Sequence, residues 1–274
     1  MPSEAPLVET ATLISREPIA PGFWCVGLRS PHIAMRARAA QFVALDVPGQ
    51  FAVRLPLGIW TVRGDEFSLL FREWGTRTTR FAALPLGARV SCIGPLGNEF
   101  SLPAAGSKAL IAAGGIGVAP FWLLARSLLA LGVETNMLLG ARTKTHLVGA
   151  QSLRELGVPL KLCTDDGSEG FAGSVIDALL EQPRPDIIYG CGPPAMLRAL
   201  CAHATQMDVA CEISMEETFG CSMGTCWGCV VRVRRGCGQG TGYPRAPHET
   251  RDYDFARVCA DGTVFSSADV LWTA

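Results

Sequence analysis

Three cysteines lie close together in the segment FGCSMGTCWGCVVRV, residues 219–233. Cys221, Cys226 and Cys229 have a C-x4-C-x2-C spacing, which together with a distant fourth cysteine is typical of plant-type [2Fe–2S] ferredoxin sites. The interleaved glycines would let the loop turn tightly around a flat cluster and point thiolates and backbone amides at it. Structural zinc sites usually have two C-x2-C pairs, and this segment has one. The pattern therefore favours an iron–sulfur cluster, with a zinc ion and disulfides as the alternatives.

A four-thiolate site needs a fourth cysteine, and two candidates follow in the sequence. Cys237 lies in a Gly-Cys-Gly-Gln-Gly turn, and Cys259 lies in the segment Arg257–Gly262. The spacing alone does not choose between them. The chain has 11 cysteines and its first residues do not have the pattern of a secretion signal. We therefore expect a cytoplasmic protein that uses thiols for metal or redox chemistry rather than for disulfides.

A glycine-rich loop, GGIGVAP at residues 114–120, follows the apolar strand expected at Ala109–Ala113 and precedes a helix that runs to about Leu131. Between a parallel strand and a helix, backbone N–H groups and the positive helix end can bind a phosphate. The loop lacks the full G-x-G-x-x-G pattern, so a purely structural turn is the alternative. The candidate cofactor-binding residues here are Gly114, Gly115, Gly117 and Pro120.

An acidic residue, Asp165, follows the strand expected at Leu160–Thr164, at the edge of the sheet where open α/β folds bind ligands. A carboxylate there would disfavour an additional ribose phosphate, which favours NAD(H) over NADP(H). Arg142 and Lys144 follow the preceding strand and would favour the phosphate. A solvated Asp-Gly turn is the structural alternative.

A third short loop, Cys-Gly-Pro-Pro, connects the strand expected at Asp186–Gly190 to a helix expected at Pro194–Gln206. Proline suits the first turn of a helix. Cys191, Gly192 and Pro193 are small enough for a flat ring to approach the backbone closely, although a structural turn explains them almost as well. We take these three residues as further candidates for cofactor binding.

The elements that must position these motifs differ between the two halves of the chain. Short β-rich segments at Phe42–Val47, Glu66–Arg72 and Arg89–Ile93 are separated by Gly/Pro turns, which predicts an antiparallel barrel or sandwich. From Lys108 strands alternate with helices, which predicts a parallel nucleotide-binding sheet. The cysteine-rich end is expected to form a small third module. The expected domains are residues 1–103, 104–208 and 209–274.

Composition excludes several classes of protein. Of 274 residues 49% are hydrophobic and 18% charged, which is enough apolar material for packed cores. The formal net charge of −1 argues against nucleic-acid binding through bulk charge. The most apolar run, Ala109–Ala125, is interrupted by glycines and Pro120, so we expect no membrane span.

Taken together, these motifs resemble those of the electron-transfer subunits of NAD-dependent dihydroorotate dehydrogenases, within the ferredoxin–NADP reductase superfamily. The resemblance implies an antiparallel flavin-binding barrel, a parallel-sheet domain that binds the pyridine nucleotide, and a C-terminal [2Fe–2S] module, in that order. The segments that carry it are 114–120, 164–167, 191–194, 214–221 and 257–265.

The resemblance also implies roles for individual residues. It selects Cys259 as the fourth cluster ligand and makes residues 235–255, which contain Cys237, an insertion. The family's Arg-Pro-aliphatic-Ser-Ile stretch at the flavin matches Arg54–Ile59, with Leu55 at the position of the arginine and Gly58 at that of the serine. Arg54 would replace that arginine only if the strand shifted by one residue. The implied FAD-binding residues are Arg54, Pro56, Leu57, Gly58, Gly75 and Thr76.

The function implied by the resemblance is electron transfer between NAD(H), FAD and a [2Fe–2S] cluster. A partner catalytic subunit, which contains FMN in the family, would take or supply the electrons. The cofactors carry the chemistry, so we expect no catalytic acid or base. The alternatives are a stand-alone NAD(P)H reductase for an oxygenase or another acceptor, the small subunit of an electron-bifurcating transhydrogenase or sulfide dehydrogenase, and a flavin-free assembly module that keeps the cluster.

Overall fold

The first part of the chain forms a closed antiparallel barrel in a computed structural model that describes residues 5–49, 53–237 and 252–272. The strand order is β1-β2-β5-β4-β3-β6. Leu13, Leu28, Leu45 and Ile59 are fully buried in the barrel core. The expected barrel is thus confirmed, and the sandwich is excluded. The elements are β1 (Leu7–Ala20), β2 (Phe23–Arg29), α1 (Pro31–Arg36), β3 (Phe42–Asp46), β4 (Leu55–Arg63), β5 (Glu66–Arg72), α2 (Thr76–Ala82) and β6 (Arg89–Leu96).

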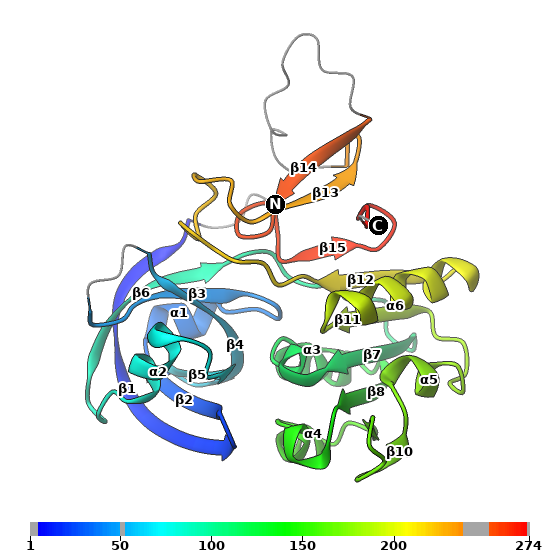
Figure 1. The fold of residues 1–274 in the computed structure, drawn as a ribbon, viewed down its shortest axis with the longest axis horizontal. Coiled ribbons are helices and arrows are strands. Elements are labelled where there is room, and N and C mark those ends of the chain that lie inside the picture. The colour runs from blue at the N-terminus through cyan, green and yellow to red at the C-terminus, as the bar shows by residue number, and fades with distance from the viewer. Residues whose placement is uncertain (1–4, 50–52, 238–251, 273–274) are drawn as a thin grey trace.

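The second part is a sheet of order β10-β9-β8-β7-β11-β12-β15, parallel except for the edge strand β15. Helices α3 and α4 cover the face toward the barrel, and α5 and α6 cover the other face (Figure 1). The elements are β7 (Lys108–Gly114), η1 (Gly115–Val118), α3 (Phe121–Ala130), β8 (Glu134–Ala141), η2 (Lys144–His146), α4 (Ala150–Glu155), β9 (Leu160–Thr164), β10 (Phe171–Ala172), α5 (Val175–Leu179), β11 (Ile187–Cys191), α6 (Pro194–Gln206), β12 (Ala210–Ser214) and β15 (Val264–Ser266).

The apolar run Ala109–Ala125 is divided between β7, the η1 turn and the start of α3. In the parts of the chain that the structure describes, no helix is long and apolar enough to cross a membrane. Helix α3 packs instead against β4 of the barrel, where Arg126 Nη1 donates a 3.0 Å hydrogen bond to the carbonyl of Val62.

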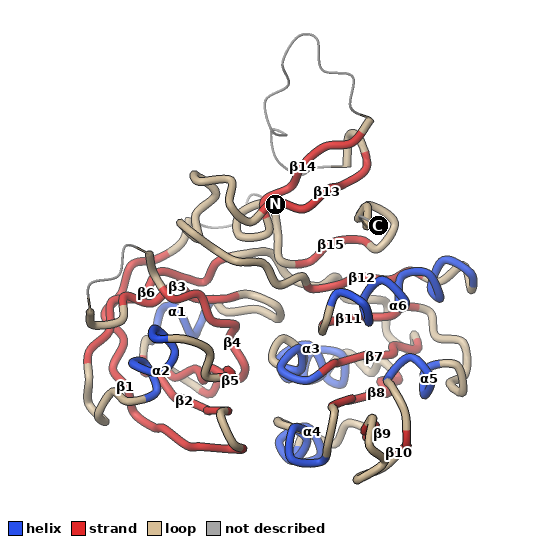
Figure 2. Tube along the Cα trace, in the orientation of Figure 1, coloured by secondary structure: helices blue, strands red, loops and turns tan. Residues whose placement is uncertain are grey.

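The cysteine-rich end is attached to both other parts. Strands β13 (Val230–Arg234) and β14 (Tyr253–Arg257) form a separate antiparallel pair, which stands beyond the barrel and the sheet in Figure 2. Strand β12 follows the domain boundary expected at residue 209 but pairs with β11 in the parallel sheet. That boundary remains a prediction.

A shared core joins the cysteine-rich module to the barrel. Phe42 of β3 and Ile93 of β6 pack in one cluster with Phe219, Val231 and Val258. The rings of Phe42 and Phe219 are 5.1 Å apart. The cysteine-bearing loop is therefore supported by the outer surface of the barrel.

Two side chains tie the same surfaces together by hydrogen bonds. Asn98 donates to the carbonyl of Val264 and accepts from its N–H, both at 2.8 Å. Thr263 Oγ1 donates to the carbonyl of Ala40, also at 2.8 Å. Because these bonds lie next to the apolar cluster, they position the cysteine loop relative to the barrel.

Candidate functional site

A cavity of about 760 Å³ opens at the carboxyl edge of the parallel sheet. The structure brings several of the predicted residues together there, since Gly114, Gly115, Gly117, Asp165, Gly192 and Pro193 all line the cavity. Cys191 is 1% exposed and Pro120 is buried, so these two lie behind the lining. The three motifs thus converge because parallel strands present their carboxyl ends at one edge.

Small residues are required where two of these loops meet. A Cβ at Gly117 would lie 2.5 Å from the carbonyl oxygen of Cys191, and one at Gly114 would lie 2.8 Å from Pro193 Cδ. Gly115 differs, because its φ of +57° suits glycine and a Cβ there would meet no described atom within 4 Å. Gly115 therefore leaves its backbone open to a ligand in the cavity.

Residues that the sequence analysis did not select also line the cavity. Phe23 and Arg72 come from the barrel, and His146 comes from the η2 turn of the sheet domain. The rings of Phe23 and His146 are 5.9 Å apart, and the Arg72 guanidinium lies 5.8 Å from the Phe23 ring. Arg142, which the sequence analysis noted, lines the same cavity. No local motif marks Phe23, Arg72 or His146, since they meet only when the two domains pack.

Glu216 is another cavity residue that the sequence analysis did not select, although it lies in the Ser214–Cys221 segment that carries the family resemblance. It lines the cavity beside Met215 and Glu217, on the loop after β12. Desolvation by the surrounding protein raises the pKa of the Glu216 carboxyl. Its charge acts on Cys191 and contributes, after burial, to the raised pKa of that thiol.

The predicted flavin-binding stretch lies on β4, where side chains alternate between the two faces of the barrel wall. Leu55 and Ile59 are 5% and 0% exposed inside the barrel. Leu55 pairs with Leu45 of β3. Arg54, Pro56 and Gly58 therefore lie on the outer face without any shift of the strand, and Leu57 lies on the inner one.

Arg54 is held on that outer face by β6. Its Nη1 lies 3.3 Å from both the carbonyl oxygen and the Oγ of Ser91. A Cβ at Gly58 would meet no described atom within 4 Å, so the outer face beside it is open. Arg54 is thus on the same outer face as Pro56 and Gly58.

Gly75 and Thr76 lie at the start of α2, close to the beginning of β4. Gly75 is the N-cap residue, with a φ of +76°, and Thr76 is the first residue of the helix. Arg77 Nη1 donates to the carbonyl of Arg54 at 2.7 Å and to that of Val53 at 3.4 Å. Arg77 therefore reaches from α2 to the backbone of Arg54, at the end of the barrel wall where β4 begins.

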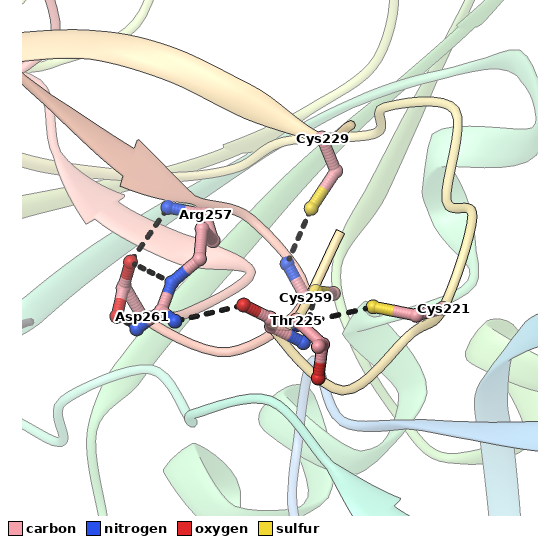
Figure 3. Close-up of polar contacts among 7 residues, drawn as sticks. Cys221, Thr225, Cys229, Arg257, Cys259 and Asp261 are labelled. Atoms are coloured by element: carbon pink, nitrogen blue, oxygen red, sulfur yellow. Dashed lines mark hydrogen bonds and ion pairs between the residues drawn. The ribbon is translucent and has the colours of Figure 1, made fainter. Parts of the chain in front are cut away.

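The cysteine loop directs its backbone N–H groups at sulfur atoms (Figure 3). Cys221 Sγ accepts hydrogen bonds from Met223, Thr225 and Cys226, at 3.4, 3.2 and 3.3 Å. Cys259 Sγ accepts one from Gly224 at 3.2 Å, which joins the distant cysteine to the loop. Amide hydrogens around sulfur favour the thiolate, the form that binds metals.

The four thiols form two pairs. Cys226 Sγ accepts from the N–H of Cys221 at 3.4 Å, and Cys229 Sγ accepts from that of Cys259 at 3.5 Å. Partial burial would raise the pKa of Cys221, but N–H donors outweigh it and lower the pKa to about 6. Burial and then the Cys229 thiol raise the pKa of Cys259 to about 12. Among the described residues, no three His, Cys, Asp or Glu side chains are grouped to hold a single metal ion.

Cys237 has a different environment from these four. Its thiol is hydrogen-bonded to Asp269, and this bond, together with burial, raises its pKa. Cys259, in contrast, is 2% exposed inside the apolar cluster that also contains Cys229. The environments therefore support Cys259 over Cys237 as the fourth ligand.

Arg257 fastens the two segments that carry these cysteines. It donates to Asp261 from Nε at 2.9 Å and from Nη2 at 2.7 Å, and to the carbonyl of Gly224 at 2.8 Å. Its guanidinium lies 4.7 Å from the Trp227 ring. Burial alone would raise the pKa of Asp261, but the bonds from Arg257 lower it below its usual value. Arg257 therefore holds the segment that carries Cys259 against the cysteine loop.

Replacing Arg257 with alanine is expected to lower the free energy of unfolding by about 3 kcal/mol, because it leaves the buried Asp261 carboxylate without its cation. The Arg257 and Asp261 side chains are 20% and 6% exposed. Arg29→Ala is the matched control, since Arg29 forms an ion pair on the surface and its loss should change stability little. Urea unfolding measures the free energy of unfolding of both variants. An Arg257→Ala variant as stable as the Arg29→Ala variant would contradict the stabilising role of Arg257.

The barrel, the parallel sheet and the cavity between them define an oxidoreductase with the ferredoxin–NADP reductase-like fold. A model of the oxidoreductase NAD-binding domain matches residues 110–202. A solved structure of an NADH-dependent reduced ferredoxin-NADP oxidoreductase, studied for flavin-based electron bifurcation, superposes with a TM-score of 0.81 at 25% identity. This match covers 96% of this chain and 90% of that one.

Curated relatives give the family. The dihydroorotate dehydrogenase B (NAD(+)) electron transfer subunit of Geobacillus sp. is 34% identical over 273 residues, which covers 96% of this chain and 98% of the relative. The subunit of the same name from Desulforamulus reducens is 32% identical over 261 residues, covering 93% and 94%. The chain belongs to this family of electron transfer subunits. These findings confirm the resemblance, the fold class and the assignment as an electron-transfer oxidoreductase.

Proposed function

We propose that this chain carries electrons between NAD(H), FAD and a [2Fe–2S] cluster, and exchanges them with a catalytic partner of the dihydroorotate dehydrogenase type that contains FMN. One observation carries the proposal. The cysteine loop, whose N–H groups point at four paired thiols, is packed directly on the outer wall of a flavin-type barrel. Such a protein would work in the cytoplasm, where its thiols stay reduced.

For the dinucleotide, the proposed binding residues are those at the carboxyl edge of the sheet. The open backbone at Gly115 and the positive end of α3 suit a phosphate. Asp165 suits the hydroxyls of a ribose without an additional phosphate. Gly192 and Pro193 leave room for a flat nicotinamide ring over the buried Cys191. This arrangement supports NAD(H) as the nucleotide.

For FAD, the proposed residues are Arg54 directly before β4, Pro56, Leu57 and Gly58 on β4, and Gly75 and Thr76 at the start of α2. Arg54 and Arg77 supply the positive charge that FAD phosphates need, because both lie at the same end of the wall. The open space at Gly58 leaves room for a ring system against the outer face. When bound, FAD accepts a hydride and the cluster carries single electrons. The side chains orient these groups and transfer no proton themselves.

For the cluster, the proposed ligands are Cys221, Cys226, Cys229 and Cys259. Two pairs of thiols suit a cluster of two irons, since each iron takes two ligands, whereas a tetrahedral zinc ion needs all four around one point. Every one of the four sulfur atoms accepts a hydrogen bond from a backbone N–H, which stabilises the thiolate form. The donor set therefore fits the [2Fe–2S] cluster. All four cysteines are free thiols, so nothing supports disulfides.

The surface beside the cluster loop supports a docking partner. Cys226 is exposed, and Met223, three residues before it, is 55% exposed. A ligand at the surface would bring the cluster near any protein bound there. The relatives' name implies a dihydroorotate dehydrogenase as that protein.

The second candidate is the small subunit of an electron-bifurcating enzyme. The structure of the NADH-dependent reduced ferredoxin-NADP oxidoreductase favours it, because its match extends over 96% of this chain and so includes the cysteine module. The two candidates share every cofactor site proposed above and differ in the partner subunit.

Co-expression with the dihydroorotate dehydrogenase of the same organism tests the proposed partner. We expect one complex that contains FMN, FAD and iron and that reduces NAD+ when dihydroorotate is added. The matched control is a Met223→Glu variant, which places a charge on the surface beside Cys226 and should weaken the complex. Elution of the two proteins as separate species, with no electron transfer on mixing, would contradict the proposal.

A further inference from the structure

Ser222 is buried in the cysteine loop and has an unsatisfied hydroxyl group. It follows Cys221 directly, and its exposed fraction is 1%. Within the described parts of the chain, Ser222 Oγ has no hydrogen-bond partner. Buried polar groups are almost always hydrogen-bonded, so such a hydroxyl calls for an explanation.

The backbone of Ser222 is also unfavourable for a side chain. Its φ is +60°, in the left-handed region that glycine adopts freely and other residues adopt at a cost. Gly220 and Gly224 lie on either side of Ser222, and an added Cβ at either of them would lie very close to another atom. The segment therefore has glycine where a side chain would not fit. A serine at residue 222 thus combines a strained backbone with an unpaired hydroxyl. Strained residues that persist in this way tend to lie at functional sites.

The surroundings of Ser222 indicate what its hydroxyl would bind. The next residues, Met223, Gly224 and Thr225, all direct their N–H groups at cysteine sulfur atoms. The loop therefore turns its backbone N–H groups toward cysteine sulfur atoms. Ser222 is shielded from water and no described protein atom accepts its proton, which fits an acceptor held by the loop itself.

We propose that the Ser222 hydroxyl donates a hydrogen bond to a sulfur of the [2Fe–2S] cluster and thereby raises the reduction potential of that cluster. The inference rests on the proposed function, since it requires the cluster to be present. Ser222 is a positioning and tuning residue rather than a ligand, because cysteines already supply the four thiolates.

The direction of the effect follows from electrostatics. One-electron reduction adds negative charge to the cluster, and part of it resides on the sulfur atoms. A hydrogen bond to a charged acceptor is stronger than one to a less charged acceptor. The hydroxyl therefore stabilises the reduced cluster more than the oxidised one. Hydrogen bonds to the sulfurs are among the factors that set cluster potentials.

Equilibrium redox titration of the purified full chain tests the proposal, with the reduced cluster followed by electron paramagnetic resonance. We expect Ser222→Ala to lower the ratio of reduced to oxidised cluster about tenfold at a fixed potential, which corresponds to about 59 mV for one electron. Ser222→Gly removes the same hydroxyl and also relieves the backbone, so it should fold well and give the same shift. In D2O, the reduced wild type should show a coupled exchangeable deuteron that both variants lose.

Each other outcome contradicts part of the account. Wild-type potentials in both variants would overturn the role of Ser222 and leave the proposed function intact. A shift in Ser222→Ala alone would assign the effect to the backbone and would overturn the hydrogen bond. A wild-type protein that binds no [2Fe–2S] cluster after reconstitution would overturn the proposed function, and with it the acceptor.

Discussion

Cys259→Ser is expected to abolish the [2Fe–2S] spectrum, or to leave a residual cluster at less than about a tenth of the wild-type iron content. Loss of one of four ligands opens one iron to water, and metal-ligand replacement removes folding energy as well as binding energy. Cys259 accepts a hydrogen bond from Gly224 in the cysteine loop and lies 2% exposed beside Cys229. Its thiol is therefore already held against the cysteine loop and beside Cys229.

Cys237→Ser is the matched control for this prediction. The Cys237 thiol is engaged with Asp269, so its replacement should leave the cluster spectrum and iron content unchanged. Iron analysis and visible circular dichroism of the two variants give the answer. A cluster retained in Cys259→Ser and lost in Cys237→Ser would show that the fourth ligand has been assigned wrongly.

Leu55→Arg is expected to destabilise the barrel by about 3 kcal/mol and to leave FAD affinity no higher than in the wild type. Sequence comparison with the family would suggest the opposite, since this change restores the arginine of the flavin motif. The structure places Leu55 inside the barrel opposite Leu45, at 5% exposure. An arginine there would bury an unpaired charge, one of the recognised causes of severe destabilisation.

Arg54→Ala is the companion variant on the outer face. It removes a guanidinium that would bind an FAD phosphate, and hydrogen bonds to charged groups are each worth about 1.5–3 kcal/mol. We therefore expect FAD to bind about ten- to a hundredfold more weakly. Arg63→Ala, at the exposed far end of the same strand, is the control and should leave affinity unchanged. Fluorescence titration with FAD measures all three, and tighter binding by Leu55→Arg would contradict the outward position of Arg54.

Local patterns were sufficient to predict much of this molecule. The spacing of Cys221, Cys226 and Cys229 predicts a cluster loop, because three of the four ligands would come from within a few residues. The alternation of strands and helices after Lys108 predicts a parallel sheet, and a parallel sheet gathers its loops at one edge. The glycine loop and Asp165 therefore meet in one cavity. Figure 1 shows the neighbouring strands β8, β7 and β11 of that sheet.

Features that depend on distant pairing could not be predicted in the same way. The face of Arg54 follows from the register of Leu55 with Leu45, and a one-residue slip would reverse it. Phe23 and His146 meet across the two domains, with no shared motif to connect them. The unpaired hydroxyl of Ser222 depends on burial by the folded loop, and the sequence shows only a serine after a cysteine.

Anaerobic titration of the FAD-reconstituted chain with NADH tests the central claim most directly. The flavin absorption and the electron paramagnetic resonance signal of the reduced cluster are recorded together, and NADPH is titrated in parallel. The account predicts that NADH bleaches the flavin and that the cluster signal grows with it, with NADPH reacting much more slowly. A protein that binds the cluster but takes up no FAD, or whose cluster stays oxidised while the flavin is reduced, would contradict it.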